Sequence, residues 1–172
     1  MGPALLLVDV IKDFEHEDGE RLLASYRERH SALVQALEQA RGAHRPVVYA
    51  NDSAGAWDSD TPALVRHAVE RGRGGNLVAA VAPAPGEAFV LKPRYSGFDA
   101  TPLESLLRGM DVEELEVAGT ATEMCVFQTV TDAIRLGFRP AVRADACATV
   151  SEENERLALD YLERVLGVEI RS

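Results

Sequence analysis

The chain has 172 residues, 47% hydrophobic and 27% charged, which is ordinary for a soluble globular protein and enough for one domain with a full core. Its formal net charge of −10, from 18 Lys and Arg against 28 Asp and Glu, argues against nucleic acid or an anionic membrane as a partner, because both attract clustered cations. Two cysteines without CxxC spacing argue against a disulfide framework, and no stretch approaches transmembrane length. We therefore expect a single domain over residues 1–172 in a reducing, cytoplasmic environment.

Strand and helix patterns alternate from the start of the chain. Ala4–Val8 is a continuous apolar run, typical of a parallel strand buried on both faces, and it is too short for a secretory segment. Apolar residues then recur every three or four positions from Leu22 to Ala40, which predicts a helix that ends at Gly42. A second strand is expected at Pro46–Ala50, followed by a polar loop.

The middle of the chain has clear helix starts. Proline at the first helical position predicts a short helix over about residues 62–70, and three glycines within residues 72–75 predict a flexible link. Ala88–Leu91 is a third strand. Thr101–Glu104 has the pattern of a capping box, which predicts a helix that runs to about Arg108.

The stretch from Glu114 to Val126 is expected to be a strand, a tight turn and the first turn of a helix. The apolar run ends at Gly119, and Thr122 is a predicted N-cap, which places Cys125 at the third helical position. Unpaired N–H groups and the helix dipole at that position favour a thiolate, as a nucleophile requires. The alternative is a small buried residue at a helix start, since free cysteine is among the most buried residue types.

The remaining residues repeat the alternation. Arg139–Val142 is a fifth predicted strand, residues 145–150 a loop, Ser151 the start of a last helix, and Val168–Ile170 a short final strand. Strand–helix alternation throughout predicts an α/β fold, a three-layer α-β-α sandwich around a mostly parallel sheet of about six strands in a Rossmann-like order.

Three polar residues follow or end predicted strands at the carboxyl edge of this sheet: Asp9, Lys92 and Cys125. Taken singly, Asp9 could be a cap or an ion-pair partner and Lys92 a solvated loop cation. Together they supply a carboxylate that can accept the proton of a thiol and a cation that favours the thiolate. The four histidines fall in predicted loops or helices away from the strand ends: His16, His30, His44 and His67.

Three motifs resemble those of the isochorismatase-like cysteine hydrolases, a family that includes nicotinamidases, N-carbamoylsarcosine amidohydrolases and isochorismatases. Residues 7–14, LVDVIKDF, resemble the family's VDxQxDF opening. Residues 92–98, KPRYSGF, resemble its K-x-R-x-S-x-F loop, and residues 119–126, GTATEMCV, its G-x-x-T-x-x-C-V turn. The motifs occur in the family's order and at its spacing, and the match covers nearly the whole chain.

The resemblance implies a role for each matching residue. Asp9 would act as general base and then acid, Lys92 would stabilise the thiolate, and Cys125 would attack an amide carbon to give a thioester that water hydrolyses. The backbone N–H groups of Ala121 and Cys125 would hold the oxyanion, with a cis peptide bond between Thr120 and Ala121. The resemblance also implies a homodimer or homotetramer.

Departures from the family pattern reduce the number of family activities that fit this sequence. Nicotinamidases of the family build a metal site from an aspartate followed closely by histidines, but no histidine follows Asp52 closely. We therefore expect no metal and no other cofactor, and a nicotinamidase becomes less favoured. The presence of Cys125 favours hydrolysis of a C–N bond in a small amide over cleavage of the isochorismate ether. An isochorismatase-type ether hydrolase and a catalytically silent binding subunit remain the alternatives.

Four residues are candidates for contact with a small-molecule substrate. Trp57 would form an aromatic wall, although a surface tryptophan that covers the core edge fits equally well. Arg94 could clamp a substrate carboxylate or pair with a nearby acid. Phe14 and Phe98 would form the pocket wall or part of the core. The second cysteine, Cys147, is expected to be structural.

Overall fold

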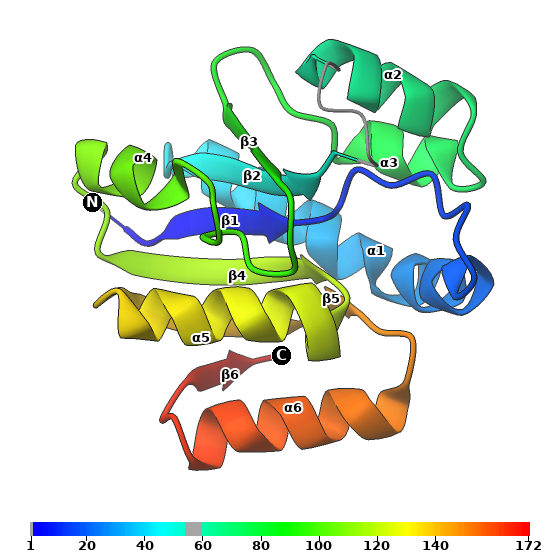
Figure 1. Cartoon of the computed structure of the whole chain (residues 1–172). Helices are drawn as coiled ribbons and strands as arrows, with labels where there is room; N and C mark the ends of the chain where they lie inside the picture. The colour runs from blue at the N-terminus through cyan, green and yellow to red at the C-terminus, as the bar shows by residue number, and fades with distance from the viewer. Residues whose placement is uncertain (1, 54–59) are drawn as a thin grey trace.

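In the computed structural model, which describes residues 2–53 and 60–172, six strands form one parallel sheet between two layers of helices (Figure 1). The strands are β1 (Ala4–Val8), β2 (Val47–Asp52), β3 (Ala88–Lys92), β4 (Glu114–Thr120), β5 (Arg139–Ala148) and β6 (Glu169–Arg171). The helices are α1 (Gly19–Gly42), α2 (Thr61–Glu70), α3 (Gly75–Ala80), α4 (Leu103–Gly109), the π-helix η1 (Thr122–Val126), α5 (Phe127–Arg135) and α6 (Glu152–Arg164). The predicted α/β sandwich is confirmed.

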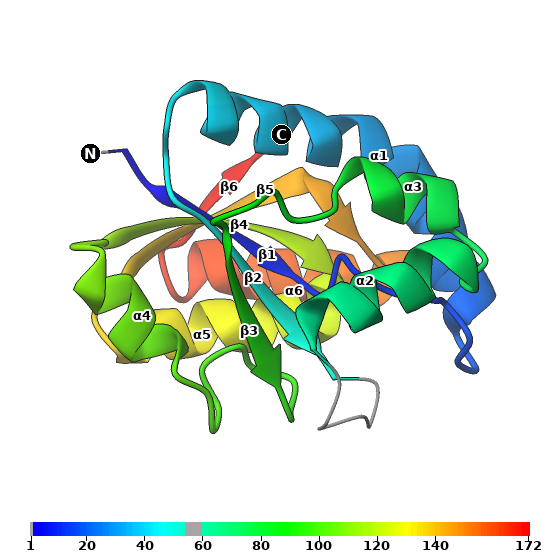
Figure 2. The ribbon, with the colours of Figure 1, turned by 90° about the horizontal axis from the view of Figure 1, so that it is seen from above.

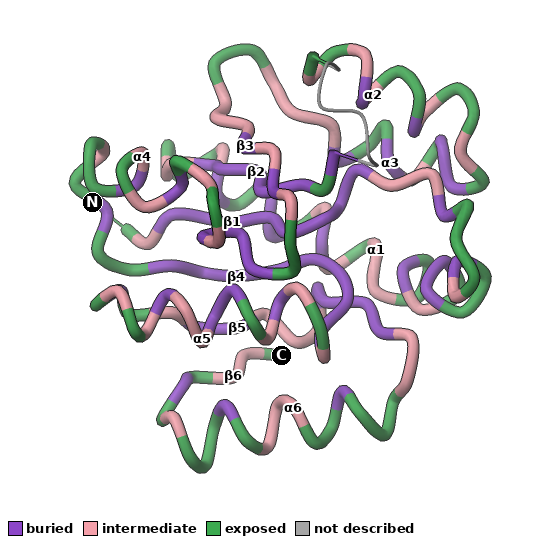
Figure 3. Tube along the Cα trace, in the orientation of Figure 1, coloured by how far each residue is buried: buried purple, intermediate pink, exposed green. Residues whose placement is uncertain are grey.

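The two helical layers bury the central strands on both faces. Helices α1 and α3 lie on one side of the sheet, and α4, α5 and α6 lie on the other (Figure 2). All five residues of β1 are fully buried, as its continuous apolar sequence predicted, and most of β4 is buried as well (Figure 3). None of the described helices is long and apolar enough to cross a membrane.

The strand order creates a crevice beside β1. The sheet runs β3-β2-β1-β4-β5-β6, so the chain builds outward from β1 to one edge and then returns to β4 and builds toward the other. Ligands of open α/β sheets bind at the carboxyl ends of the strands where this direction reverses. Asp9 directly follows β1, and Cys125 lies five residues after β4 ends at Thr120.

Gly119 allows β4 to approach β1 at this crevice. Its φ is +138°, and a Cβ atom at this position would lie 2.0 Å from the carbonyl oxygen of Val8. Only glycine accommodates both the backbone conformation and the contact.

We expect Gly119→Ala to lower the free energy of unfolding by about 3 kcal/mol or more, since either β4 or β1 must shift to remove the clash. Urea unfolding followed by circular dichroism measures the loss. The control is Gly42→Ala at the end of α1, where an added Cβ meets no atom within 4 Å. Equal stability of the two variants would show that the close approach is not required.

The predicted link around residues 72–75 is shorter than expected, because residues 71–74 form the turn between α2 and α3 and Gly75 already begins α3. Here the glycines permit close packing. A Cβ on Gly75 would lie 2.0 Å from the carbonyl oxygen of Val69, and one on Gly74 would lie 2.9 Å from the ring of Phe14. Composition alone does not distinguish a glycine that gives flexibility from one that allows a close contact.

The fifth strand is also longer than predicted. It continues beyond Val142 to Ala148, so much of the expected loop at residues 145–150 is strand. The pairing of β5 with β4 shifts register between Val117 and Gly119, after which Gly119 pairs with Cys147. A register shift of this kind interrupts the side-chain alternation by which a strand is recognised in sequence.

Candidate active site

Asp9, Lys92 and Cys125 lie together at the carboxyl edge of the sheet. Asp9 is 1% exposed and adopts a left-handed φ of +50°, a conformation that aspartate tolerates better than most residues. Lys92 ends β3 and is 2% exposed, which is rare for a lysine without a partner. Cys125 lies within η1 and is partly exposed. Three segments far apart in sequence thus place a carboxylate, an ammonium group and a thiol in one site.

The Lys92 ammonium group joins the other two side chains. Its Nζ lies 2.8 Å from Oδ2 of Asp9 and donates to Sγ of Cys125 at 3.4 Å and to the carbonyl oxygen of Arg94 at 2.9 Å. The other carboxylate oxygen of Asp9 accepts from the backbone N–H of Asp52 at 2.7 Å. Both oxygens of Asp9 are therefore held, and its carboxylate is oriented by two separate strands.

The segment Thr120–Val126, which we term the nucleophile turn, differs from the predicted helix start. Thr122 is not an N-cap, because the turn is a π-helix that begins at Thr122 and its hydroxyl donates elsewhere. The carbonyl of Ala121 accepts from the N–H groups of Met124 and Val126, the two neighbours of Cys125. Short π-helical segments are rare and occur often at functional sites. The peptide bond between Thr120 and Ala121 is cis, as the family resemblance implied.

The surroundings of Cys125 favour the neutral thiol, whereas the sequence led us to expect a stabilised thiolate. Burial, and after it the Asp9 carboxylate, together raise the pKa of Cys125 to about 12, while Lys92 opposes both effects. For Lys92, burial lowers the pKa, but Asp9 and Cys125 outweigh burial, so its net shift is upward. The site therefore has a charged Asp9–Lys92 pair beside a protonated thiol, with a base in position to accept the proton.

We expect alkylation of Cys125 by iodoacetamide to accelerate about tenfold for each pH unit between pH 8 and pH 10, without the plateau that a free thiol reaches near its pKa of about 8.5. Peptide mass spectrometry measures the rate. Cys147 is fully buried and should stay unmodified in the same samples. Lys92→Met should slow the reaction of Cys125 further, because it removes the group that lowers its pKa. A plateau below pH 9 would contradict the raised pKa.

A cavity of about 700 Å³ opens onto the three side chains. Its wall includes Arg94, as the sequence suggested, and Arg94 pairs with Asp99 at 3.2 Å, with most of its side chain exposed. Helix α2 adds Leu64 and His67 to the wall. The cavity is lined by carboxylates, an ammonium group and apolar side chains, and such a lining suits a small polar molecule.

The sequence analysis expected all four histidines to lie away from the strand ends, and this is wrong for two of them. His16 and His67 both line the cavity, and Nε2 of His67 lies 3.4 Å from Oδ2 of Asp13. Nothing in the local sequence marks His67 as a site residue, because only the packing of α2 against the carboxyl edge brings it there. His16 stands in the loop after β1, where its nearness to the VDxQxDF-like motif was a usable signal.

Two of the predicted substrate-binding residues belong to the core instead. Phe14 is fully buried against Tyr26, at a ring-centroid distance of 5.2 Å. Phe98 stacks on Phe138 at 5.6 Å and is 9% exposed. Their motif positions place them near the strand ends, but their side chains turn inward, where aromatic area is buried. Trp57 lies outside the described residues.

The described residues do not form a metal centre. Within the described ranges, residues 2–53 and 60–172, no group of three or more His, Cys, Asp and Glu side chains is arranged to hold a metal ion. Asp52 lines the cavity, but by itself it is too small a ligand set for a transition metal.

Comparison with known proteins identifies the family. The family model of the isochorismatase domain matches residues 3–171. The isochorismatase family protein YaaI of Bacillus subtilis is 31% identical over 97% of this chain and 92% of its own. The nicotinamidase/pyrazinamidase PncA of Bacillus subtilis superposes with a TM-score of 0.78 and 27% identity over the full length of both chains. The N-carbamoylsarcosine amidase of Thermoplasma acidophilum superposes with a TM-score of 0.75 and 26% sequence identity, over 99% of this chain and 96% of its own. With this motif set, this fold and these relatives, the chain belongs to the isochorismatase family of hydrolases.

Proposed function

We propose that this hydrolase cleaves the C–N bond of a small amide through a thioester on Cys125, with Asp9 and Lys92 completing a catalytic triad. The observation that carries the proposal is the position of Lys92, whose Nζ lies 2.8 Å from the Asp9 carboxylate and 3.4 Å from the Cys125 sulfur at the base of the cavity. A buried carboxylate and ammonium pair beside a thiol is costly to fold, and a catalytic use accounts for it.

In the first half of the reaction, the Asp9 carboxylate accepts the thiol proton while Sγ of Cys125 attacks the amide carbon. The electron pair of the C=O bond moves to oxygen, where the N–H groups of Ala121 and Cys125 stabilise the negative charge. Asp9 then gives its proton to the nitrogen, the C–N bond breaks, and an amine or ammonia leaves. Burial and Asp9 raise the pKa of the resting thiol, so a base that takes the proton during the attack favours the reaction.

In the second half, Asp9 accepts a proton from water as the water oxygen attacks the thioester. The same two N–H groups hold the oxyanion, and its collapse breaks the C–S bond. The carboxylic acid is released and the thiol regains its proton, so the net reaction is amide plus water to acid plus amine. Throughout, the Lys92 ammonium group orients Asp9 and offsets the negative charge that passes between Asp9 and Cys125.

Ammonia release from a panel of small amides tests the proposal. The names of the structural relatives suggest nicotinamide, pyrazinamide and N-carbamoylsarcosine as the first members of this panel. Turnover of any amide that requires Cys125 would support the proposal. Binding of panel members without turnover would indicate a silent binding subunit, and ammonia release that survives loss of Cys125 would show that C–N cleavage does not pass through a thioester on Cys125.

A further inference from the structure

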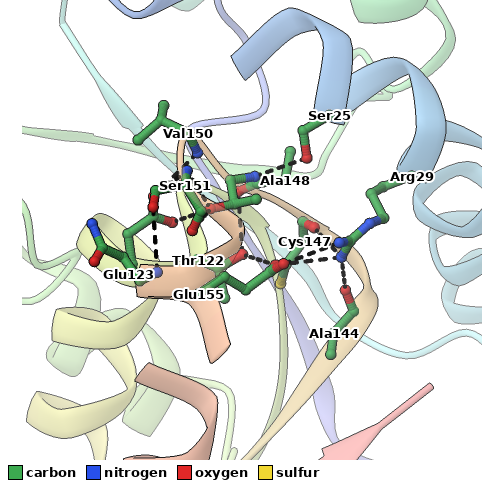
Figure 4. Close-up of polar contacts among 12 residues, drawn as sticks. Ser25, Arg29, Thr122, Glu123, Ala144, Cys147, Ala148, Val150, Ser151 and Glu155 are labelled. Atoms are coloured by element: carbon green, nitrogen blue, oxygen red, sulfur yellow. Dashed lines mark hydrogen bonds and ion pairs between the residues drawn. The ribbon is translucent and has the colours of Figure 1, made fainter. Parts of the chain in front are cut away.

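A second buried carboxylate lies close to the nucleophile turn, and the proposed reaction does not use it. Glu155, in the first turn of α6, is 6% exposed. Its Oε1 accepts from the hydroxyl of Thr122 at 2.8 Å, and its Oε2 accepts from Nη2 of Arg29 at 3.0 Å (Figure 4). Because a buried carboxylate is costly without donors, these contacts are what stabilise it there.

Arg29 extends the contact into the sheet. The same Nη1 atom that lies 3.3 Å from Glu155 donates to the carbonyl oxygens of Ala144 at 2.8 Å and Cys147 at 3.0 Å, both in β5. The Arg29–Glu155 pair therefore joins three elements that are remote in sequence: α1, β5 and α6. Oγ1 of Thr122 also lies 3.2 Å from the carbonyl oxygen of Ala148, so the turn contacts the same end of β5.

Glu123, the next residue of the nucleophile turn, is also hydrogen-bonded to the segment that leads into α6. The carboxylate of Glu123 accepts from the Thr149 hydroxyl at 2.7 Å and from the N–H groups of Val150 and Ser151, each at 3.1 Å (Figure 4). Consecutive side chains of the nucleophile turn are thus anchored to the segment that leads into α6. The residue just before them is Ala121, one of the two proposed oxyanion donors.

We propose that Glu155 is a positioning residue of this site: through Thr122, with Arg29 as its counter-charge, it holds the N–H groups of Ala121 and Cys125 in the geometry that the oxyanion requires. The inference rests on the proposed function. A carboxylate suits this role because it accepts from the Thr122 hydroxyl and the Arg29 guanidinium at once. Glutamine at position 155 has one accepting oxygen, so its NH₂ group would face one of those donors.

The first test compares two matched ion pairs. Arg29–Glu155 and Arg41–Glu87 have similar exposures, 30% and 8% against 33% and 13%, but Glu87 lies just before β3, at the opposite edge of the sheet. We expect Glu155→Gln to lower kcat about tenfold or more with KM changed less than about twofold, because small displacements of catalytic groups affect the transition state most. Glu87→Gln should keep the kcat of the wild type while losing a similar amount of stability in urea.

The second test acts on the turn and remains informative if Glu155→Gln does not fold. Thr122→Val removes the hydroxyl and should lower kcat about tenfold or more, whereas Thr122→Ser keeps it and should restore most of the rate. Thr131→Val is the control, since the Thr131 hydroxyl donates to the carbonyl oxygen of Phe127 within α5.

Four outcomes distinguish this inference from the proposed function. A kcat for Glu155→Gln equal to that of Glu87→Gln, or equal rates for the valine and serine variants at position 122, would overturn the positioning role while amide hydrolysis stands. A proportional rise in KM with unchanged kcat would also overturn it. Turnover that does not need Cys125 would instead remove the proposed function, and the positioning inference with it.

Discussion

Replacing Cys125 with alanine should lower kcat for any amide that the wild type hydrolyses by about ten-thousandfold or more. The variant has no sulfur to form the thioester, and water attack on a bound amide without a nucleophile is far slower. Folding should be little affected, because the side chain is partly exposed and its hydrogen bond from Lys92 is only one of three that Nζ makes. Ammonia release under saturating substrate, with unfolding curves of both proteins, measures the two effects separately.

The second cysteine provides the matched control. Cys147 is fully buried in β5, and Cys147→Ala should cost about 1–2 kcal/mol of stability while most of the turnover remains. Cys125→Ala should therefore lose activity and keep its stability, whereas Cys147→Ala should keep activity and lose stability. Ammonia release that persists in Cys125→Ala would refute the thioester mechanism and favour direct attack of water on the amide.

Replacing Lys92 with methionine should impair stability and activity together. Asp9, at 1% exposure, would lose the ammonium group 2.8 Å from its carboxylate, and breaking a buried pair by removing one partner costs about 3–5 kcal/mol. The rate should fall about a hundredfold or more, because the orientation of Asp9 and the charge balance of the transition state both depend on Lys92. Urea unfolding at pH 7 and kcat measure the two losses.

The double variant Asp9→Asn/Lys92→Met separates these losses. With both charges removed, no uncompensated ion remains in the core, and stability should return to within about 1–2 kcal/mol of the wild type. Activity should stay absent, since the base is gone. A double variant that is no more stable than Lys92→Met would show that the pair is held by packing rather than by its charges.

The sheet and the three central site residues could be predicted because their signals are local. A continuous apolar run such as Ala4–Val8 is buried on both faces wherever it lies in a parallel sheet, and a polar residue at its end must then stand at the carboxyl edge. Since all six described strands are parallel, Asp9, Lys92 and Cys125 come to one edge without any knowledge of the detailed packing.

The directions of single side chains depend on packing between remote elements, and there the sequence was insufficient. Phe14 and Phe98 follow motif positions near the strand ends, yet both turn into the core, where their rings meet Tyr26 and Phe138. His67 belongs to the cavity only because α2 packs against its edge. Periodicity gives the face of an element that is apolar, but it does not give the neighbour that covers that face.

The protonation of Cys125 also depends on tertiary contacts that the local sequence does not give. Its position in the chain identified Cys125, and local rules on helix starts predicted a thiolate. The tertiary structure favours the thiol instead, because burial and the carboxylate of Asp9, more than a hundred residues earlier in the chain, together outweigh Lys92. By itself, the sequence determined the fold class and the three residues that meet at the sheet edge. Only the tertiary structure decided their protonation and the Glu155 contacts behind them, since both depend on distances and solvent exclusion between segments that are far apart in the chain.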